Sequence, residues 1–270
     1  MNVINDAQRS AAKVAALAYP ISMAFVASAN FGLRGDLVVN GDVAETVRRI
    51  AAAEPLYRLS VVFDLVYATG IIVLLTALYV VLSPVNRYLA LLASFSKLVY
   101  AATAVLIALS SLSVLRLASD PTYLQGLGPG PLHALVELNS SGAWEQYYVG
   151  LVFWALSSTL FGWLWLKSRY VPAALALFGL VSSAWCVFCT IAYLMNPAFA
   201  SVVNVWLFDM PMALFYLALS CWLLFKGLGG TSAHVVSLIG DSFTLHERAL
   251  ASSGFRCRRS TTPIFCPCCL

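Results

Sequence analysis

Two long apolar stretches follow each other in the first half of the chain: Leu59–Leu82 (LSVVFDLVYATGIIVLLTALYVVL) and Tyr88–Leu112 (YLALLASFSKLVYAATAVLIALSSL). Each exceeds the about 20 residues with which an α-helix crosses the roughly 30 Å hydrocarbon core of a bilayer. Between them lies Ser83-Pro84-Val85-Asn86-Arg87, and the residue before a proline disfavours helical backbone. The two stretches therefore predict a transmembrane helical hairpin.

The composition of the whole chain agrees with a membrane protein. Of its 270 residues, 61% are hydrophobic and 10% are charged, whereas a soluble domain carries about 25% charged residues. Such a chain cannot cover itself with a polar surface, so the lipid bilayer is its expected solvent and partner. The net charge of +4 comes without a basic stripe or interleaved aromatic residues, which argues against nucleic-acid binding.

Further apolar runs extend the hairpin to a bundle. The expected fold class is an all-α, polytopic membrane helix bundle within residues 1–227. The six transmembrane helices are expected at about 14–33, 59–82, 88–112, 146–166, 172–195 and 202–225. The first run continues past the cleavage-site mimic Ala27-Ser28-Ala29 to Leu33 and so exceeds the about 7–15 apolar residues of a signal peptide. It is expected to be an uncleaved helix.

The first loop carries the pattern of a short amphipathic helix. Asp42 followed by Glu45 resembles a capping box, and Val43, Val47 and Ile50 recur at helical spacing. A surface helix is the favoured interpretation, and a lid over a cavity is the alternative.

The composition changes after the last apolar run. Residues 228–270 are rich in Ser, Arg and Cys, and the chain ends Cys266-Pro267-Cys268-Cys269-Leu270. A prenylation signal needs a cysteine fourth from the end, where Pro267 stands. This segment is expected to be a disordered tail.

Three ionisable residues lie inside the apolar runs: Asp64, Lys97 and Asp209. The helical rise places Asp64 and Asp209 in the outer half of the bilayer and Lys97 near its midplane, from where the long lysine side chain can reach outward. The sequence therefore predicts a buried charge cluster of these three residues. It is either an ion pair that fixes helix register or a ligand or ion site. Glu54 and Arg58 are four residues apart and are expected to pair at a helix start.

Six spans place both termini on the same side of the membrane. The basic residues Arg9, Lys13, Arg87, Lys167, Arg169 and Lys226 are concentrated on that side. Because cytoplasmic loops carry the excess of Lys and Arg, both termini are expected in the cytoplasm.

Several motifs resemble a bacterial membrane family known as domain of unknown function 4386. They are Val39-Asn40-Gly41-Asp42, Glu54-Pro55-Leu56-Tyr57-Arg58, Asp64, Leu78-Tyr79, Ser83–Arg87, Leu89–Ala93 and Trp222–Gly227. The resemblance covers about Ala11 to Gly227 and implies a six-helix integral protein of the bacterial inner membrane, without an assigned activity. The chain departs from the family pattern at Lys97, where the resemblance implies an arginine, and at Asp209, which stands at a shifted position.

No motif points to catalysis. His133, His234 and His246 all lie outside the expected spans, so haem ligation is not expected, and the sequence predicts no metal site, cofactor or enzymatic activity. Two hypotheses stay open for an integral membrane protein with a buried charge cluster. One is a small-molecule or ion transporter or sensor that uses Asp64, Lys97 and Asp209. The other is a structural or assembly protein with a dry core and a lipid-facing groove of small residues. The small-molecule ligand and the protein partner are left open.

Overall fold

A computed structural model describes residues 4–39, 41–126, 128–196, 198–199 and 203–229. The expected tail at 228–270 thus falls outside the described residues, apart from its first two. The elements in chain order are α1 (Asp6–Ala27), the π-helix η1 (Ser28–Leu33), α2 (Val43–Ala52), α3 (Glu54–Leu82), α4 (Arg87–Ser119), α5 (Pro121–Gly126), α6 (Pro129–Ser168), α7 (Ala173–Met195) and α8 (Val205–Phe225).

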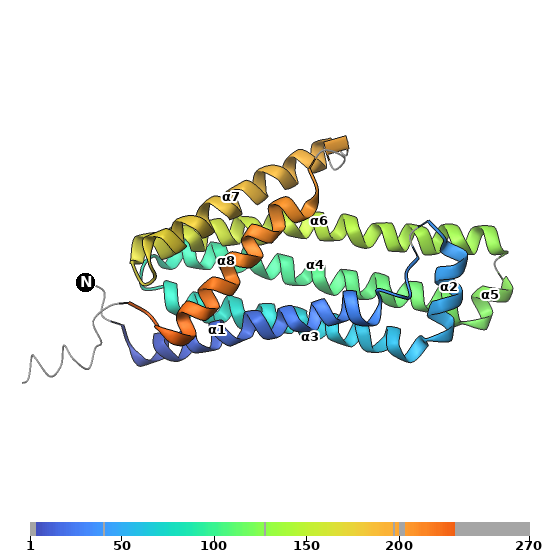
Figure 1. The fold of residues 1–270 in the computed structure, drawn as a ribbon, viewed down its shortest axis with the longest axis horizontal. Coiled ribbons are helices and arrows are strands. Elements are labelled where there is room, and N and C mark those ends of the chain that lie inside the picture. The colour runs from blue at the N-terminus through green and yellow to red at the C-terminus, as the bar shows by residue number, and fades with distance from the viewer. Residues whose placement is uncertain (1–3, 40, 127, 197, 200–202, 230–270) are drawn as a thin grey trace, which may run out of the picture.

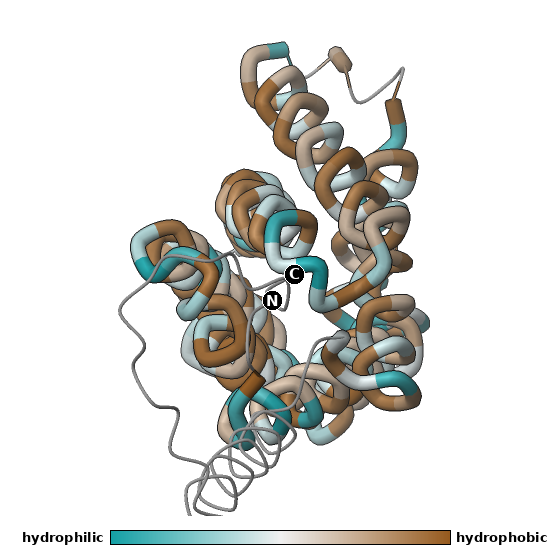
Figure 2. The backbone as a smooth tube through the Cα atoms, turned by 90° about the vertical axis from the view of Figure 1, so that its left-hand side faces the viewer, coloured by the Kyte–Doolittle hydropathy of each residue, from teal (hydrophilic) through white to brown (hydrophobic). Residues whose placement is uncertain are grey.

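In the described part of the chain, six helices are long and apolar enough to cross a membrane, which confirms the all-α polytopic bundle. They are α1 continued by η1, and α3, α4, α6, α7 and α8. Figure 2 looks along the bundle and shows hydrophobic residues on every one of these helices. Many large apolar side chains, such as Val62, Leu109 and Val181, are exposed on the outside. In a membrane these side chains face lipid.

The six spans contact one another in a ring in the order α1, α3, α4, α6, α7, α8 and back to α1. The start of α1 and the end of α8 lie at the same end of the bundle (Figure 1). Side-chain and backbone hydrogen bonds join the segments there: the Gln8 amide donates to the Val81 carbonyl and to the Tyr170 hydroxyl, and the Gly229 amide donates to the Tyr170 carbonyl.

At the opposite end, α3, α4 and α6 extend past α7 and α8 (Figure 1). With 40 residues, α6 is about 60 Å long, which is twice the roughly 30 Å hydrocarbon core. It begins at Pro129, well before residue 146, where the sequence predicts the start of this span, because Leu132 and Val136 pack into a second apolar core. That core lies between the ends of α3, α4 and α6 and is covered by α2 (Figure 1).

The expected amphipathic helix is confirmed as α2, and the Asp42 side chain caps it by accepting from the Glu45 amide. Val47 and Ile50 are buried in the second core. The favoured interpretation, a surface helix, agrees with this packing, because the side chains beneath α2 are closely packed and apolar.

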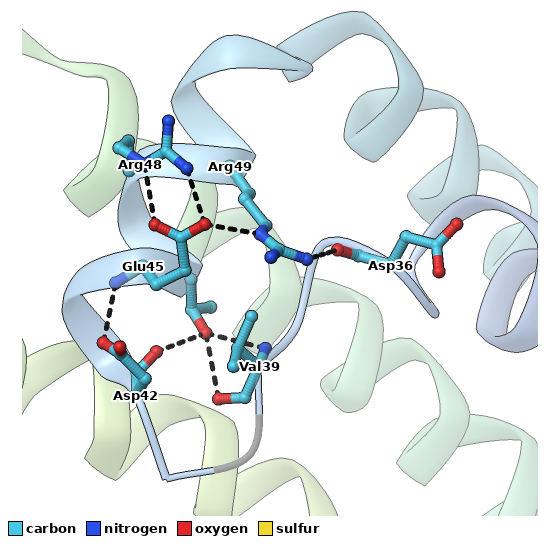
Figure 3. A network of polar contacts seen from close by, with 7 residues as sticks. Asp36, Val39, Asp42, Glu45, Arg48 and Arg49 are labelled. Atoms are coloured by element: carbon cyan, nitrogen blue, oxygen red, sulfur yellow. Dashed lines mark hydrogen bonds and ion pairs between the residues drawn. The ribbon is translucent and has the colours of Figure 1, made fainter.

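On the outer side of α2, Glu45 accepts hydrogen bonds from Arg48 and Arg49, as Figure 3 shows. These bonds lower the pKa of Glu45 from 4.5 to about 2. Because the pKa is lowered on folding, the stabilisation of α2 by Glu45 is present above about pH 4.5 and is lost as the pH falls towards 2. We expect a carbon-13 NMR titration of the Glu45 carboxyl to show this low midpoint. The double substitution Arg48→Gln/Arg49→Gln should return it to the ordinary range, and an unchanged midpoint would contradict the assignment.

The helices of the second half of the ring approach each other at glycines. A Cβ on Gly179 would lie 2.3 Å from the ring of the buried Phe215, so α7 and α8 can pack at this distance only without a side chain there. We expect Gly179→Ala to lower the free energy of unfolding by about 1–3 kcal/mol, as overpacked cores do, in denaturation from mixed micelles. Gly142→Ala on α6 is the control, because a Cβ there meets nothing within 4 Å, and an equal loss in both variants would refute the close-packing argument.

Candidate functional site

A buried ion pair joins Arg34 to Asp64. Nη2 of Arg34 donates to both carboxylate oxygens of Asp64, at 2.7 and 2.8 Å. Its Nη1 donates to the Ser111 hydroxyl on α4 at 3.1 Å. The side chains of Arg34 and Asp64 are only 11% and 7% exposed. This pair ties the end of the first span to α3 and α4.

Local backbone geometry positions Arg34. The first span ends in η1, and the Arg34 amide closes it by donating to the Ala29 carbonyl. A π-helix is a rare conformation that is often found at functional sites. The wider turn of η1 carries the chain to the level of Asp64, ten residues after the first residue of α3.

The structure corrects the expected cluster of Asp64, Lys97 and Asp209, because each of the three has a different partner. Asp64 precedes Leu82 by 18 residues and Lys97 follows Arg87 by 10, which separates them by roughly 12 Å along the antiparallel pair at about 1.5 Å per residue. Lys97 therefore lies closer than the Arg34–Asp64 pair to the end of the bundle that holds the α3–α4 connection.

Lys97 lies at the centre of the ring of spans and is completely buried. Its Nζ donates to the Tyr216 hydroxyl at 2.6 Å and lies 3.5 Å from the centre of the Trp154 ring. The Tyr216 hydroxyl also shares a hydrogen bond with the buried Ser158. Lys97, Trp154, Ser158 and Tyr216 form what we call the Lys97 site, which draws on α4, α6 and α8.

Aromatic rings extend from the Lys97 site towards α1 and α3. Tyr19 on α1 stacks on Tyr216 at 4.9 Å between ring centres, and Tyr100 lies 4.7 Å from Trp154. The hydroxyls of Tyr100 and Tyr67 are hydrogen-bonded at 2.7 Å. The centre of the bundle is thus occupied by tyrosine and tryptophan side chains with their polar atoms buried.

Asp209 lies near the start of α8 and is half-buried. Its carboxylate accepts a hydrogen bond from the Tyr147 hydroxyl on α6 at 2.7 Å. Asp209 precedes Tyr216 by seven residues, so the two side chains share one face of α8 about 10 Å apart.

Among the residues that the structure describes, two of the three intramembrane charges therefore have no counter-charge. Among the described residues, ion pairs join Arg34 to Asp64, Glu45 to Arg48 and Arg49, and Glu54 to Arg58. Neither Lys97 nor Asp209 is in any of them. The Glu54–Arg58 pair expected at a helix start has an N–O distance of 2.6 Å and lies on the exposed surface at the start of α3, away from the Lys97 site.

The sequence predicted the three intramembrane charged residues, but it did not predict the residues that contact them. Arg34 is the first residue after the first apolar run, and a basic residue there was the available signal for a partner of Asp64. Trp154 and Tyr216 lie within apolar runs rich in aromatic residues, and nothing in the spacing distinguishes them from ordinary lipid-facing or core residues.

The arrangement offers an ammonium, a carboxylate and several hydroxyls, all held by helices. The described residues contain no group of three or more His, Cys, Asp or Glu that could hold a metal ion. Cys186 and Cys189 are buried in α7, where an apolar environment leaves thiols unreactive. The ammonium, carboxylate and hydroxyl groups can bind charge and can donate or accept protons.

No curated protein and no solved structure matches this chain. The model of one family, described as domain of unknown function 4386, matches residues 14–227. This range runs from within the first span to the second residue after the last span and so includes every residue of the Lys97 site. The chain therefore belongs to the family of domain of unknown function 4386 and is an integral membrane protein with six spans.

Proposed function

We propose that this protein binds an ion or small molecule in the bacterial inner membrane, as a transporter or sensor, through Lys97 and Asp209 and without catalysing a reaction. The observation that carries the proposal is the complete burial of Lys97 without a carboxylate partner among the described residues. A charged residue at the bilayer centre costs about 2.5–3.5 kcal/mol on insertion scales, and such residues usually mark ion or substrate pathways.

The three intramembrane charges differ in how they support this proposal. Arg34 neutralises Asp64 with good geometry, so a structural role accounts for that pair. Lys97 donates to Tyr216, and Asp209 precedes Tyr216 by seven residues on the same face of α8. A binding site that spans both residues would combine a positive group, a negative group and aromatic walls.

The orientation proposed is with both termini in the cytoplasm. The end of the bundle that holds the start of α1 and the end of α8 also carries Arg87, Lys167 and Lys226 (Figure 1). The excess of basic residues on the cytoplasmic side supports this orientation. Asp209, α2 and the second core would then lie towards the outside.

A role in assembly is the second candidate, because a lipid-facing pocket of about 420 Å³ opens between α1 and α3. The pocket includes the small residues Ala18, Ser22 and Gly70, which allow close approach of another helix. This candidate would place the function on the outside of the bundle and would leave Lys97 and Asp209 as residues that fix packing.

Complementation of a deletion strain separates the two candidates. Growth and metabolite pools are compared in the deletion strain and after return of the wild-type gene, Lys97→Met or Asp209→Asn. The matched controls are Lys167→Met and Asp36→Asn, whose residues are exposed. We expect the wild type and the controls to restore the wild-type profile. The two core variants should reach the membrane in equal amount and fail to restore it. Full restoration by both core variants would refute the proposed binding role.

A further inference from the structure

We propose that the pocket between α1 and α3 holds an acyl chain of a zwitterionic phospholipid, and that the Glu54–Arg58 pair binds the phosphate and ammonium groups of its headgroup. The pocket, which we call the α1–α3 pocket, is lined by side chains from Ala18–Ser22 of α1 and from Val62–Val73 of α3. The inference goes beyond the proposed function, because it involves neither Lys97 nor Asp209. It is carried by the depth of the pocket, its apolar lining and the charged pair at one end.

The α1–α3 pocket covers the depth of one leaflet. Along α3 it runs from Val62 to Val73, a rise of about 16 Å, and half of the roughly 30 Å hydrocarbon core is about 15 Å. Val73 precedes Leu82 by nine residues and Lys97 follows Arg87 by ten. The Val73 end is therefore level with Lys97, which the sequence places near the midplane. An acyl chain of one leaflet ends at this depth, whereas a partner's transmembrane helix would continue through the other leaflet.

The lining of the α1–α3 pocket suits an apolar chain. Both of its hydroxyls are bonded within their own helices, because Ser22 donates to the Ala18 carbonyl and Thr69 donates to the Leu65 carbonyl. The other lining residues are apolar or glycine. The volume of about 420 Å³ lies within the roughly 300–1,000 Å³ of small-molecule sites. A hydrocarbon chain can fill this space without burying an unpaired hydrogen-bonding group.

The Glu54–Arg58 pair lies at the depth of the lipid headgroups. Arg58 precedes Val62 by four residues and therefore shares its face of α3. It precedes Val73 by 15 residues, which is about 22 Å along the helix. In a bilayer about 40–45 Å thick, the headgroup region ends about 20–22 Å from the midplane. A lipid whose tail fills the pocket thus brings its headgroup to this pair.

The pair keeps one group of each charge available to a ligand. Nε and Nη2 of Arg58 both contact Oε1 of Glu54, at 2.7 and 2.6 Å. Nη1 of Arg58 and Oε2 of Glu54 have no hydrogen bond to any described residue. The side chains of Arg58 and Glu54 are 60% and 36% exposed. A headgroup can therefore reach both side chains without separating them.

A zwitterionic headgroup with an ammonium group matches these two charges. Its phosphate accepts hydrogen bonds from a guanidinium group, and its ammonium group donates to a carboxylate. A headgroup with a net negative charge could bind Arg58 in the same way, but it would bring no positive group to Glu54. The α1–α3 pocket thus holds the tail, and the pair selects the headgroup.

Photo-cross-linking tests the position of the tail. The full chain is placed in nanodiscs of equal parts phosphatidylethanolamine and phosphatidylglycerol, with a diazirine on an acyl chain of the phosphatidylethanolamine, and the adducts are located by mass spectrometry. We expect adducts on the α1–α3 pocket and their loss in Thr69→Phe, whose ring would occupy it. Thr76→Phe is the matched control and should retain them. Thr76 is exposed on the same helix, its hydroxyl is bonded like that of Thr69, and it does not line the pocket.

The headgroup is tested by moving the diazirine to the phosphatidylglycerol and comparing the two yields of adducts. We expect the wild type to prefer phosphatidylethanolamine, and Glu54→Gln to lose this preference. Arg58→Gln should lower the yield with phosphatidylethanolamine about two- to fivefold, the size of an exposed ionic contact. Arg48→Gln is the control, because Arg48 is an exposed partner of Glu45 on α2, and it should change neither yield.

Three outcomes would overturn the inference. The first is an equal yield of pocket adducts in the wild type and in Thr69→Phe. The second is a headgroup preference that neither Glu54→Gln nor Arg58→Gln changes, and these two variants alter only exposed side chains if Thr69→Phe does not fold. The third is a dimer in native mass spectrometry that Thr69→Phe alone dissociates, because the pocket would then bind a second copy of the chain. Lys97→Met should leave the adducts unchanged, so the inference and the proposed function can fail separately.

Discussion

Arg34→Met is expected to lower the free energy of unfolding by about 3–5 kcal/mol, the cost of leaving one member of a buried ion pair without its partner. The Asp64 carboxylate would keep its buried position and lose both hydrogen bonds from Nη2, and Ser111 would lose its bond from Nη1. Denaturation of the purified protein from mixed micelles measures the loss. We also expect a lower yield of folded protein in the membrane.

Two further variants test whether this loss comes from leaving the buried Asp64 carboxylate without its partner. In Arg34→Met/Asp64→Leu both charges are replaced by apolar groups, and much of the lost stability should return, since buried pairs replaced as a whole are often neutral. The matched control is Arg58→Met, which breaks the exposed pair with Glu54 and should cost about 0–1 kcal/mol. If Arg34→Met and Arg58→Met cost the same, the Arg34–Asp64 pair does not hold the first span to α3.

The six spans could be predicted from the sequence because apolar length alone determines them. A run such as Leu59–Leu82 exceeds the thickness of the hydrocarbon core, and lipid leaves the backbone no stable alternative to a helix. The amphipathic pattern of α2 and its Asp42 cap were equally local signals. In these cases the physics that decides the structure acts within a single segment.

The helix ends outside the membrane were harder to predict for a related reason. The first part of α6, from Pro129 to about Gln146, contains both polar and apolar residues and has no membrane-length hydrophobic run. Its helical state depends on Leu132 and Val136 packing into the second core with α2, α3 and α4. Such a tertiary contact is not visible in the segment itself.

The sequence predicted the charged residues of the candidate site but not the residues with which they pair. Asp64 and Lys97 stand out because charges in apolar runs are rare. Which residue neutralises Asp64 depends on the positions of three helices along the bundle axis. An error of about two helical turns in the position of one helix would place Lys97, instead of Arg34, beside Asp64. The aromatic partners of Lys97 could not be found at all from the sequence, because Trp154 and Tyr216 resemble any other aromatic residue in a span.

Tyr216→Phe tests the environment of Lys97 with the smallest possible change, the removal of one hydroxyl. Lys97 would lose its hydrogen bond to Tyr216 and keep its position over the Trp154 ring. Because hydrogen bonds to charged groups contribute about 1.5–3 kcal/mol, we expect the free energy of unfolding to fall by that amount. The measurement is the same denaturation from mixed micelles as for Arg34→Met.

The same substitution should cost less when Lys97 is already methionine. In the Lys97→Met background the Tyr216 hydroxyl retains only its bond with Ser158, which is neutral and contributes about 0.5–1.5 kcal/mol. The difference between the two backgrounds is the coupling energy of Lys97 and Tyr216. Equal losses in both backgrounds would show that the hydroxyl stabilises the bundle without acting on the lysine. In that case the Lys97 charge would be stabilised by the two aromatic rings beside Nζ, those of Trp154 and of residue 216.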